Sequence, residues 1–199
     1  MYMKLIPLFL LVGLLAVSGC SKKAPTFSPE LFSKAEAGDA VAQRNLGVCY
    51  YMGYGVNPDA KESVKWVTKA ANQGDADGQR LLGWNYATGE GITQDYKEAV
   101  KWYTKSAEQG NAWAQNELGT CYQHGNGVTQ DHKEAVKWYT QSARQGNAVA
   151  QCNLGLCYDY GLGVPKDHKE SIRWLTKAAE QGNEHAKGTL DAIKKSESK

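Results

Sequence analysis

The chain has 199 residues, of which 23 are Lys or Arg and 21 are Asp or Glu, so its formal charge is only +2. A balance this close to neutral gives no electrostatic reason to expect nucleic acid as a partner. No run of basic residues interleaved with aromatic residues appears either. The composition therefore argues against a nucleic-acid-binding protein, and the length suffices for one domain.

The N-terminal 20 residues have the pattern of a secretory signal. Lys4 supplies one positive charge, and an apolar run of 13 residues follows from Leu5 to Val17. This run is shorter than the roughly 20 residues that cross a bilayer, and it fits the roughly 7–15 residues of a signal-peptide core. Residues 17–20 then read Val-Ser-Gly-Cys.

Those four residues resemble the cleavage site of bacterial lipoproteins, in which the cysteine becomes N-terminal and carries a diacylglycerol. The resemblance implies a signal peptide at 1–19, lipidation of Cys20, a lipidated tether over 20–29 and the membrane as a partner through the lipid. An Asp after the cysteine retains enteric-type lipoproteins in the inner membrane. Ser21 therefore implies the outer membrane, with the protein facing the periplasm. An ordinary signal peptide cleaved near a cysteine is the alternative interpretation.

Beyond the tether the sequence repeats with a strict period of 36 residues. The phrase Leu-Gly-x-x-Tyr begins at Leu46, Leu82, Leu118 and Leu154. Tryptophans keep the same step at Trp66, Trp102, Trp138 and Trp174. This self-similarity indicates stacked supersecondary units that share one elongated core.

Residues 74–109 show how one unit is built. Gly74 ends one helix and Asp75 caps the next, which we expect over about 76–87 with Gly83 admitting a neighbouring helix. Paired glycines then turn the chain before an aliphatic residue that packs into the core. Asp95, with Glu98 three residues later, predicts a capping box at a second helix that ends at Gly110. The repeated acidic pairs are thus explained as caps rather than as general acids.

The motif Ala-x-x-x-Leu-Gly-x-x-Tyr-x-x-Gly-x-Gly-Val-x-x-Asp-x-x-Lys-Ala-x-x-Trp-Tyr resembles the Sel1-like repeat, a relative of the tetratricopeptide repeat. The resemblance implies an all-α fold, a right-handed α/α solenoid of helix-turn-helix units over residues 30–196. Four repeats occupy 38–73, 74–109, 110–145 and 146–181, and a polar capping helix follows at 183–196. It also implies protein binding rather than catalysis.

Four cysteines remain beyond Cys20, and we expect them to be buried or half-buried free thiols. Cys49, Cys121 and Cys157 share one repeat position, and equivalent positions on adjacent helices lie about 8–10 Å apart. A disulfide needs Cα atoms closer than about 7 Å. Cys152 lies five residues before Cys157 on one helix and points away from it.

The variable positions of the first helices form a stripe with spacing i, i+4, i+7 and i+11. By analogy with related solenoids, this stripe lines a concave groove that binds a protein. Its members in the four repeats are Val41, Asn45, Val48, Met52; Asp77, Leu81, Trp84, Thr88; Trp113, Glu117, Thr120, His124; and Val149, Asn153, Leu156, Tyr160.

Eight members of the stripe combine the residue types expected of a protein-binding surface, in which aromatic residues anchor and charges set register. They are Asp77, Leu81, Trp84, Trp113, Glu117, His124, Leu156 and Tyr160. Trp84 and Trp113 stand outside the periodic tryptophans, which makes them hot-spot candidates. The alternative is that both side chains fill gaps between helices in their own repeats.

The sequence predicts no catalytic residue, metal site, cofactor or small-molecule substrate. His132 and His168 share a repeat position, but a metal needs three or four converging ligands. His124 lies three residues after Cys121, yet two other repeats have the cysteine without the histidine.

Two functions fit this pattern: an envelope scaffold or adaptor, and an immunity protein that neutralises a secreted toxin such as a lipase. Some short Sel1-like lipoproteins resemble periplasmic inhibitors of this second kind. Display on the cell surface to bind host proteins is a third interpretation, without dedicated sequence support.

Overall fold

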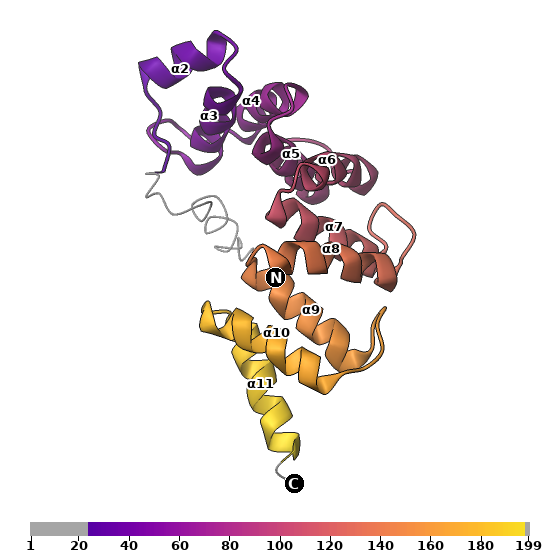
Figure 1. Cartoon of the computed structure of the whole chain (residues 1–199). Coiled ribbons are helices and arrows are strands. Elements are labelled where there is room, and N and C mark those ends of the chain that lie inside the picture. Colours follow the sequence, from indigo (N-terminus) through magenta and orange to yellow (C-terminus); the bar gives the residue numbers. More distant parts are fainter. Residues whose placement is uncertain (1–23, 198–199) are drawn as a thin grey trace, which may run out of the picture.

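The computed structural model describes residues 24–197, and within this range it contains ten α-helices and no strand (Figure 1). The signal peptide and Cys20 lie outside the described residues. The helices are α2 (Pro29–Glu36), α3 (Ala40–Met52), α4 (Ala60–Asn72), α5 (Ala76–Thr88), α6 (Tyr96–Glu108), α7 (Ala112–His124), α8 (His132–Arg144), α9 (Ala148–Tyr160), α10 (His168–Glu180) and α11 (Glu184–Glu197).

Each repeat forms one helical pair, and each pair packs against the next. The pairs are α3 with α4, α5 with α6, α7 with α8 and α9 with α10, while α2 and α11 cover the two ends. Figure 1 shows the stack running from α2 at one end to α11 at the other. The prediction of an all-α solenoid is confirmed. Between residues 24 and 197 no helix has both the length and the apolar character needed to cross a membrane.

The predicted N-caps are confirmed, but the capping box is only half formed. The Asp95 carboxylate accepts the N–H groups of Lys97 and Glu98, at 2.8 and 3.1 Å. Glu98 does not reach back to Asp95; it pairs instead with Lys101. The Asp95 N–H already donates to the carbonyl of Tyr86 at 2.9 Å, so no donor is left for the glutamate. The prediction of a reciprocal capping box is therefore wrong.

In repeats two to four, the second glycine of the turn fixes the repeat to the preceding one. Gly127 has a φ of +75°, and a Cβ built on it would lie 2.2 Å from the carbonyl oxygen of Tyr96, the first residue of α6. Only glycine permits this approach and this backbone conformation. Ile92, Val128 and Val164 follow the paired glycines and pack against the core, as predicted.

A buried glutamine in each first helix connects three helices. Gln115 donates to the carbonyl of Ala107 in α6 at 3.1 Å and accepts from Gln145, after α8, at 2.7 Å. The same arrangement recurs around Gln43, Gln79 and Gln151. Because both groups of the buried amide have partners, the glutamine stabilises the stack without an orphaned polar atom.

The four cysteines of the described residues are free and buried, as predicted. Burial raises the pKa of Cys49, Cys152 and Cys157 to about 11. For Cys121, burial and the Glu117 charge raise the pKa to about 12. Thiols held in the neutral form at physiological pH are structural rather than nucleophilic.

Candidate protein-binding face

The variable stripe lies on α3, α5, α7 and α9, and we call this surface the first-helix face. Each of these helices has 13 residues, so a stripe with its spacing runs along the whole helix. His124 and Tyr160, at the C-terminal ends of α7 and α9, are exposed, and Tyr160 is 66% exposed. Asp77, Leu81, Trp84, Trp113, Glu117 and Leu156 are half-buried.

The two tryptophans of the stripe lie at different places on the face. Trp84 is in the middle of α5, where its ring meets Tyr51 of α3 edge to face with centroids 5.2 Å apart. Trp113 is the second residue of α7 and lines a separate depression at the starts of α5, α7, α9 and α11. The structure therefore gives two candidate anchor points rather than one aromatic cluster.

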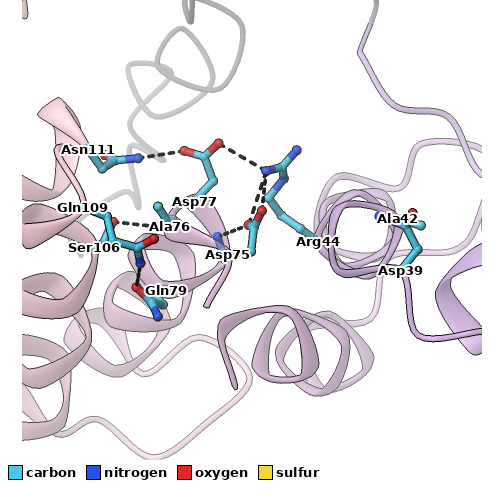
Figure 2. Close-up of polar contacts among 11 residues, drawn as sticks. Asp39, Ala42, Arg44, Asp75, Ala76, Asp77, Gln79, Ser106, Gln109 and Asn111 are labelled. Carbon is cyan, nitrogen blue, oxygen red and sulfur yellow. Dashed lines mark hydrogen bonds and ion pairs between the residues drawn. The ribbon is translucent and has the colours of Figure 1, made fainter. Parts of the chain in front are cut away.

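Asp77 connects neighbouring repeats through its carboxylate. One oxygen accepts from Arg44 of α3 at 3.3 Å, and the other accepts from the Asn111 side chain at 2.8 Å (Figure 2). Arg44 also donates to Asp75 at 3.0 Å, while Asp75 caps α5 through the N–H of Gly78. A partner that binds at Asp77 would meet an acid already engaged in the stack.

Arg80 and Glu117 place two charges inside the first-helix face. Arg80 is only 3% exposed, and its Nε has no hydrogen-bond partner. Burial raises the pKa of the Glu117 carboxyl, while a 3.3 Å hydrogen bond from Asn116 and the charge of Arg80 lower it in part. Sequence reasoning missed Arg80. The sequence did contain a sign of it, because Arg80 is charged whereas the equivalent residues of the next two repeats, Asn116 and Cys152, are not.

The repeat position of Arg80 contacts the following repeat at several places along the stack. Arg44 binds Asp77, and the Asn116 side chain accepts from Asn153 at 3.0 Å. At the last junction Cys152 Sγ lies 3.8 Å from His185 Nδ1. We call these contacts, together with Arg80 and Glu117, the junction pairs. The residue types in the junction pairs differ from one repeat junction to the next, whereas the glutamine contacts are the same at every junction.

The face also holds a cavity among α3, α4 and α5. Its lining consists of Val48, Tyr51, Met52, Ser63, Val67, Leu81, Trp84 and Asn85. The cavity has a volume of ≈ 40 Å³, is open on one side and is almost entirely apolar. It contains two predicted stripe residues, Leu81 and Trp84, together with Tyr51, which the stripe did not include.

The histidines do not converge on a set of metal ligands in the described residues. His168 Nδ1 lies 2.8 Å from an Asp159 carboxylate oxygen, an ordinary surface pair. Between residues 24 and 197 no three His, Cys, Asp or Glu residues are placed to hold a metal. His124 is exposed, whereas the Cys121 thiol is buried with a raised pKa.

These features define a helical-repeat solenoid whose variable face is available to a partner. The Sel1 repeat pattern matches residues 40–75, 76–111, 114–147 and 148–183. The chain therefore belongs to the Sel1 repeat family. Solenoids of this family typically mediate protein–protein interactions and are generally non-enzymatic scaffolds.

Solved structures agree with this assignment. A protective antigen of uropathogenic Escherichia coli, c5321, is 41% identical over 82% of this chain and 35% of its own, with a TM-score of 0.79. A Sel1 repeat protein from Oxalobacter formigenes is 37% identical over 82% of this chain and 65% of its own, with a TM-score of 0.78. The chain thus spans less than two thirds of either relative.

Two further matches are more limited. A Sel1-like repeat-containing protein of Acanthamoeba polyphaga mimivirus is 44% identical over 39 residues, which is 20% of this chain and 7% of that protein. The immunity protein Pa5087 from Pseudomonas aeruginosa has a TM-score of 0.55 at 23% identity, over 89% of this chain and 66% of its own, and shows the fold alone.

Proposed function

We propose that this protein is a lipid-anchored scaffold or adaptor that binds another protein through the first-helix face. The observation that carries the proposal is the contrast within the repeats: stacking contacts recur, while no two copies have the same four stripe residues. The apolar cavity beside Trp84 and the exposed Tyr160 give this face features that anchor a partner. The concave geometry of related solenoids supports the same surface.

The proposal places the protein in the bacterial outer membrane, facing the periplasm, with the lipid on Cys20. Metabolic labelling with a palmitate analogue tests this part. We expect the wild-type chain to be labelled and the Cys20→Ser variant to remain unlabelled. Only the labelled protein should be found in the membrane fraction. Label that persists on Cys20→Ser would reject the lipidation site, while the binding function would still stand.

Binding is tested with four baits expressed in the periplasm: wild type, Trp84→Ala, Trp113→Ala and Tyr96→Ala. Tyr96 is an exposed aromatic residue at the start of α6, outside the stripe, and serves as the matched control. We expect one partner from envelope or secreted fractions, retained by Tyr96→Ala and lost with one tryptophan variant. Because the tryptophans are apart, the variant that loses the partner locates its contact. Equal capture by all four baits would refute binding through this face.

An immunity role against a secreted toxin is the second candidate, and the observation that favours it is the fold shared with Pa5087. This role predicts one tight partner of toxic activity, and a scaffold predicts weaker binding to resident envelope proteins. Survival assays decide between them: cells lacking the protein should be killed by a rival's toxin if the role is immunity, and unaffected if it is a scaffold.

A further inference from the structure

The first repeat differs from the next two at the position that fills the centre of each helical pair. Tyr103 and Tyr139 hold this position in repeats two and three, and each is only 1% exposed. Two repeats before Tyr139 the residue is Val67. Because valine has no ring, the space among α3, α4 and α5 is not filled from inside, and the cavity described above results.

The cavity also lacks the polar groups that receive the tyrosine hydroxyl in repeat three. Tyr139 donates to Gln123 Oε1 at 2.7 Å and lies 3.2 Å from Thr120 Oγ1. Tyr51 and Val48 occupy the corresponding positions in repeat one. With Leu81 and Trp84 on the opposite wall, the cavity favours an apolar group over a hydroxyl-bearing one.

A carboxylate stands close to this cavity. Glu90 is exposed in the turn after α5, and its backbone carbonyl accepts a 3.1 Å hydrogen bond from the side chain of Asn85, which lines the cavity. Burial raises the pKa of the Tyr51 phenol, and the nearby Glu90 charge raises it further, so the two side chains interact electrostatically. Complementarity to this carboxylate calls for a basic group in whatever enters the cavity.

We propose that the cavity receives one apolar side chain of a partner polypeptide, with a Lys or Arg of the same segment beside Glu90. The end of this side chain would enter from the solvent side the ≈ 40 Å³ beside Val67 that the rings of Tyr103 and Tyr139 fill from within in their own repeats. The edge-to-face pair of Tyr51 and Trp84 would form its rim. This inference rests on the proposed function, because it specifies the partner segment for the first-helix face.

Two sets of blocked peptides in an NMR titration of the mature chain test the proposal. The first compares N-acetyl-phenylalanine amide with N-acetyl-alanine amide. We expect the phenylalanine compound to shift the methyl signals of Val48, Val67 and Leu81 saturably, and the alanine compound to leave them unchanged. The proposal would be overturned if the shifted signals belonged only to other helices, or if both compounds shifted the same signals equally. This result needs only the wild-type protein.

The variant Val67→Tyr gives repeat one the ring that repeats two and three hold at this position, and the ring should fill the cavity. We expect it to weaken phenylalanine binding at least tenfold. The matched control is Leu175→Tyr, which introduces the same residue at the equivalent position of repeat four and should bind as wild type. Unchanged binding by a folded Val67→Tyr would contradict the proposal.

The second set tests the charge. N-acetyl-Phe-Lys amide should bind about two- to fivefold more tightly than N-acetyl-Phe-Glu amide, as expected for an exposed ion pair. The preference should vanish in Glu90→Gln. If it persists there, Glu90 is not the group that selects the basic residue.

The outcome for the cavity is separable from that for the function. A captured partner that is lost by Trp84→Ala or Trp113→Ala but kept by Val67→Tyr would reject the cavity and leave the first-helix face as the binding surface. Peptide binding in the cavity with no partner lost by either tryptophan variant would reject the proposed function and leave the cavity as a site.

Discussion

The second helices and turns are nearly the same in every repeat, whereas the first-helix face differs from one repeat to the next. Lysines lie over the rings of Trp66, Trp102 and Trp174, at 3.9, 4.1 and 4.6 Å from the ring centroids. On the first-helix face, by contrast, one stripe position holds Val48, Trp84, Thr120 and Leu156 in the four repeats.

The difference shows which contacts the stack requires. Caps, turn glycines and the buried glutamines recur because each junction presents the same backbone groups. The stripe and junction pairs vary because several side-chain combinations satisfy a neighbour at those positions. Variation is therefore permitted on the face that a partner would meet, and the following changes test that separation.

The largest effect should come from the turn glycines. Gly127→Ala places a Cβ 2.2 Å from the Tyr96 carbonyl oxygen at a positive φ, so backbone must move. We expect a loss of about 3 kcal/mol or more in unfolding free energy, measured by urea denaturation.

The matched control is Gly110→Ala, which also has a positive φ, +87°, but no atom within 4 Å of the added Cβ. It should cost only about 1–2 kcal/mol, the penalty of the left-handed conformation alone. Equal losses at the two glycines would show that the contact with the preceding repeat contributes nothing.

The buried glutamines should come next. Gln115→Ala leaves the Ala107 carbonyl without its side-chain donor and removes the acceptor of Gln145. We expect a cost of about 2 kcal/mol. Gln145→Ala removes the exposed member of the same contact and should cost about 0.5–1 kcal/mol. A smaller cost for Gln115 than for Gln145 would contradict a stacking role for the buried amide.

The tyrosines of repeats two and three test whether the hydroxyl matters as well as the ring. Tyr139→Phe removes the hydrogen bonds to Gln123 and Thr120 and should cost about 1 kcal/mol by thermal unfolding. Tyr103→Phe keeps the ring at the equivalent position, where neither of those acceptors is present, and should cost less. Equal costs would mean that the hydrogen bonds to Gln123 and Thr120 add nothing to stability.

The period of 36 residues was enough to predict the helical pairs, caps, turns and free thiols, because each depends on local chemistry that repeats. Asp75 caps its helix whatever lies across the junction. The glutamate of the capping box was predicted wrongly because its target, the Asp95 N–H, is taken by the Tyr86 carbonyl across the turn.

The candidate site depended more on contacts between repeats. Asp77 is engaged by Arg44 from the preceding repeat and Asn111 from the next, residues 33 and 34 positions away. Trp84 and Trp113 lie on the same face but at different places along it, because Trp84 is in the middle of α5 and Trp113 is near the start of α7. The cavity was visible only indirectly, as a valine at position 67 where two later repeats have tyrosine.

The smallest effect should come from Glu117, and its direction depends on pH. Burial raises the pKa of this carboxyl above its ordinary value of 4.5, so the folded state favours the protonated form. Its favourable contribution is complete below the unfolded-state pKa and is lost as pH rises through the higher folded-state value. Glu117→Gln should therefore be slightly more stable than wild type at pH 7, and its stability should fall less between pH 4.5 and 7.

The matched control for this profile is Glu108→Gln, an exposed glutamate at the end of α6. Denaturant midpoints of the three proteins across the same pH range give the comparison. If Glu117→Gln is instead less stable than wild type at pH 7, the carboxylate is needed to compensate the buried Arg80. The junction between repeats two and three would then depend on that charge pair, and the first-helix face would contribute to stacking as well as to binding.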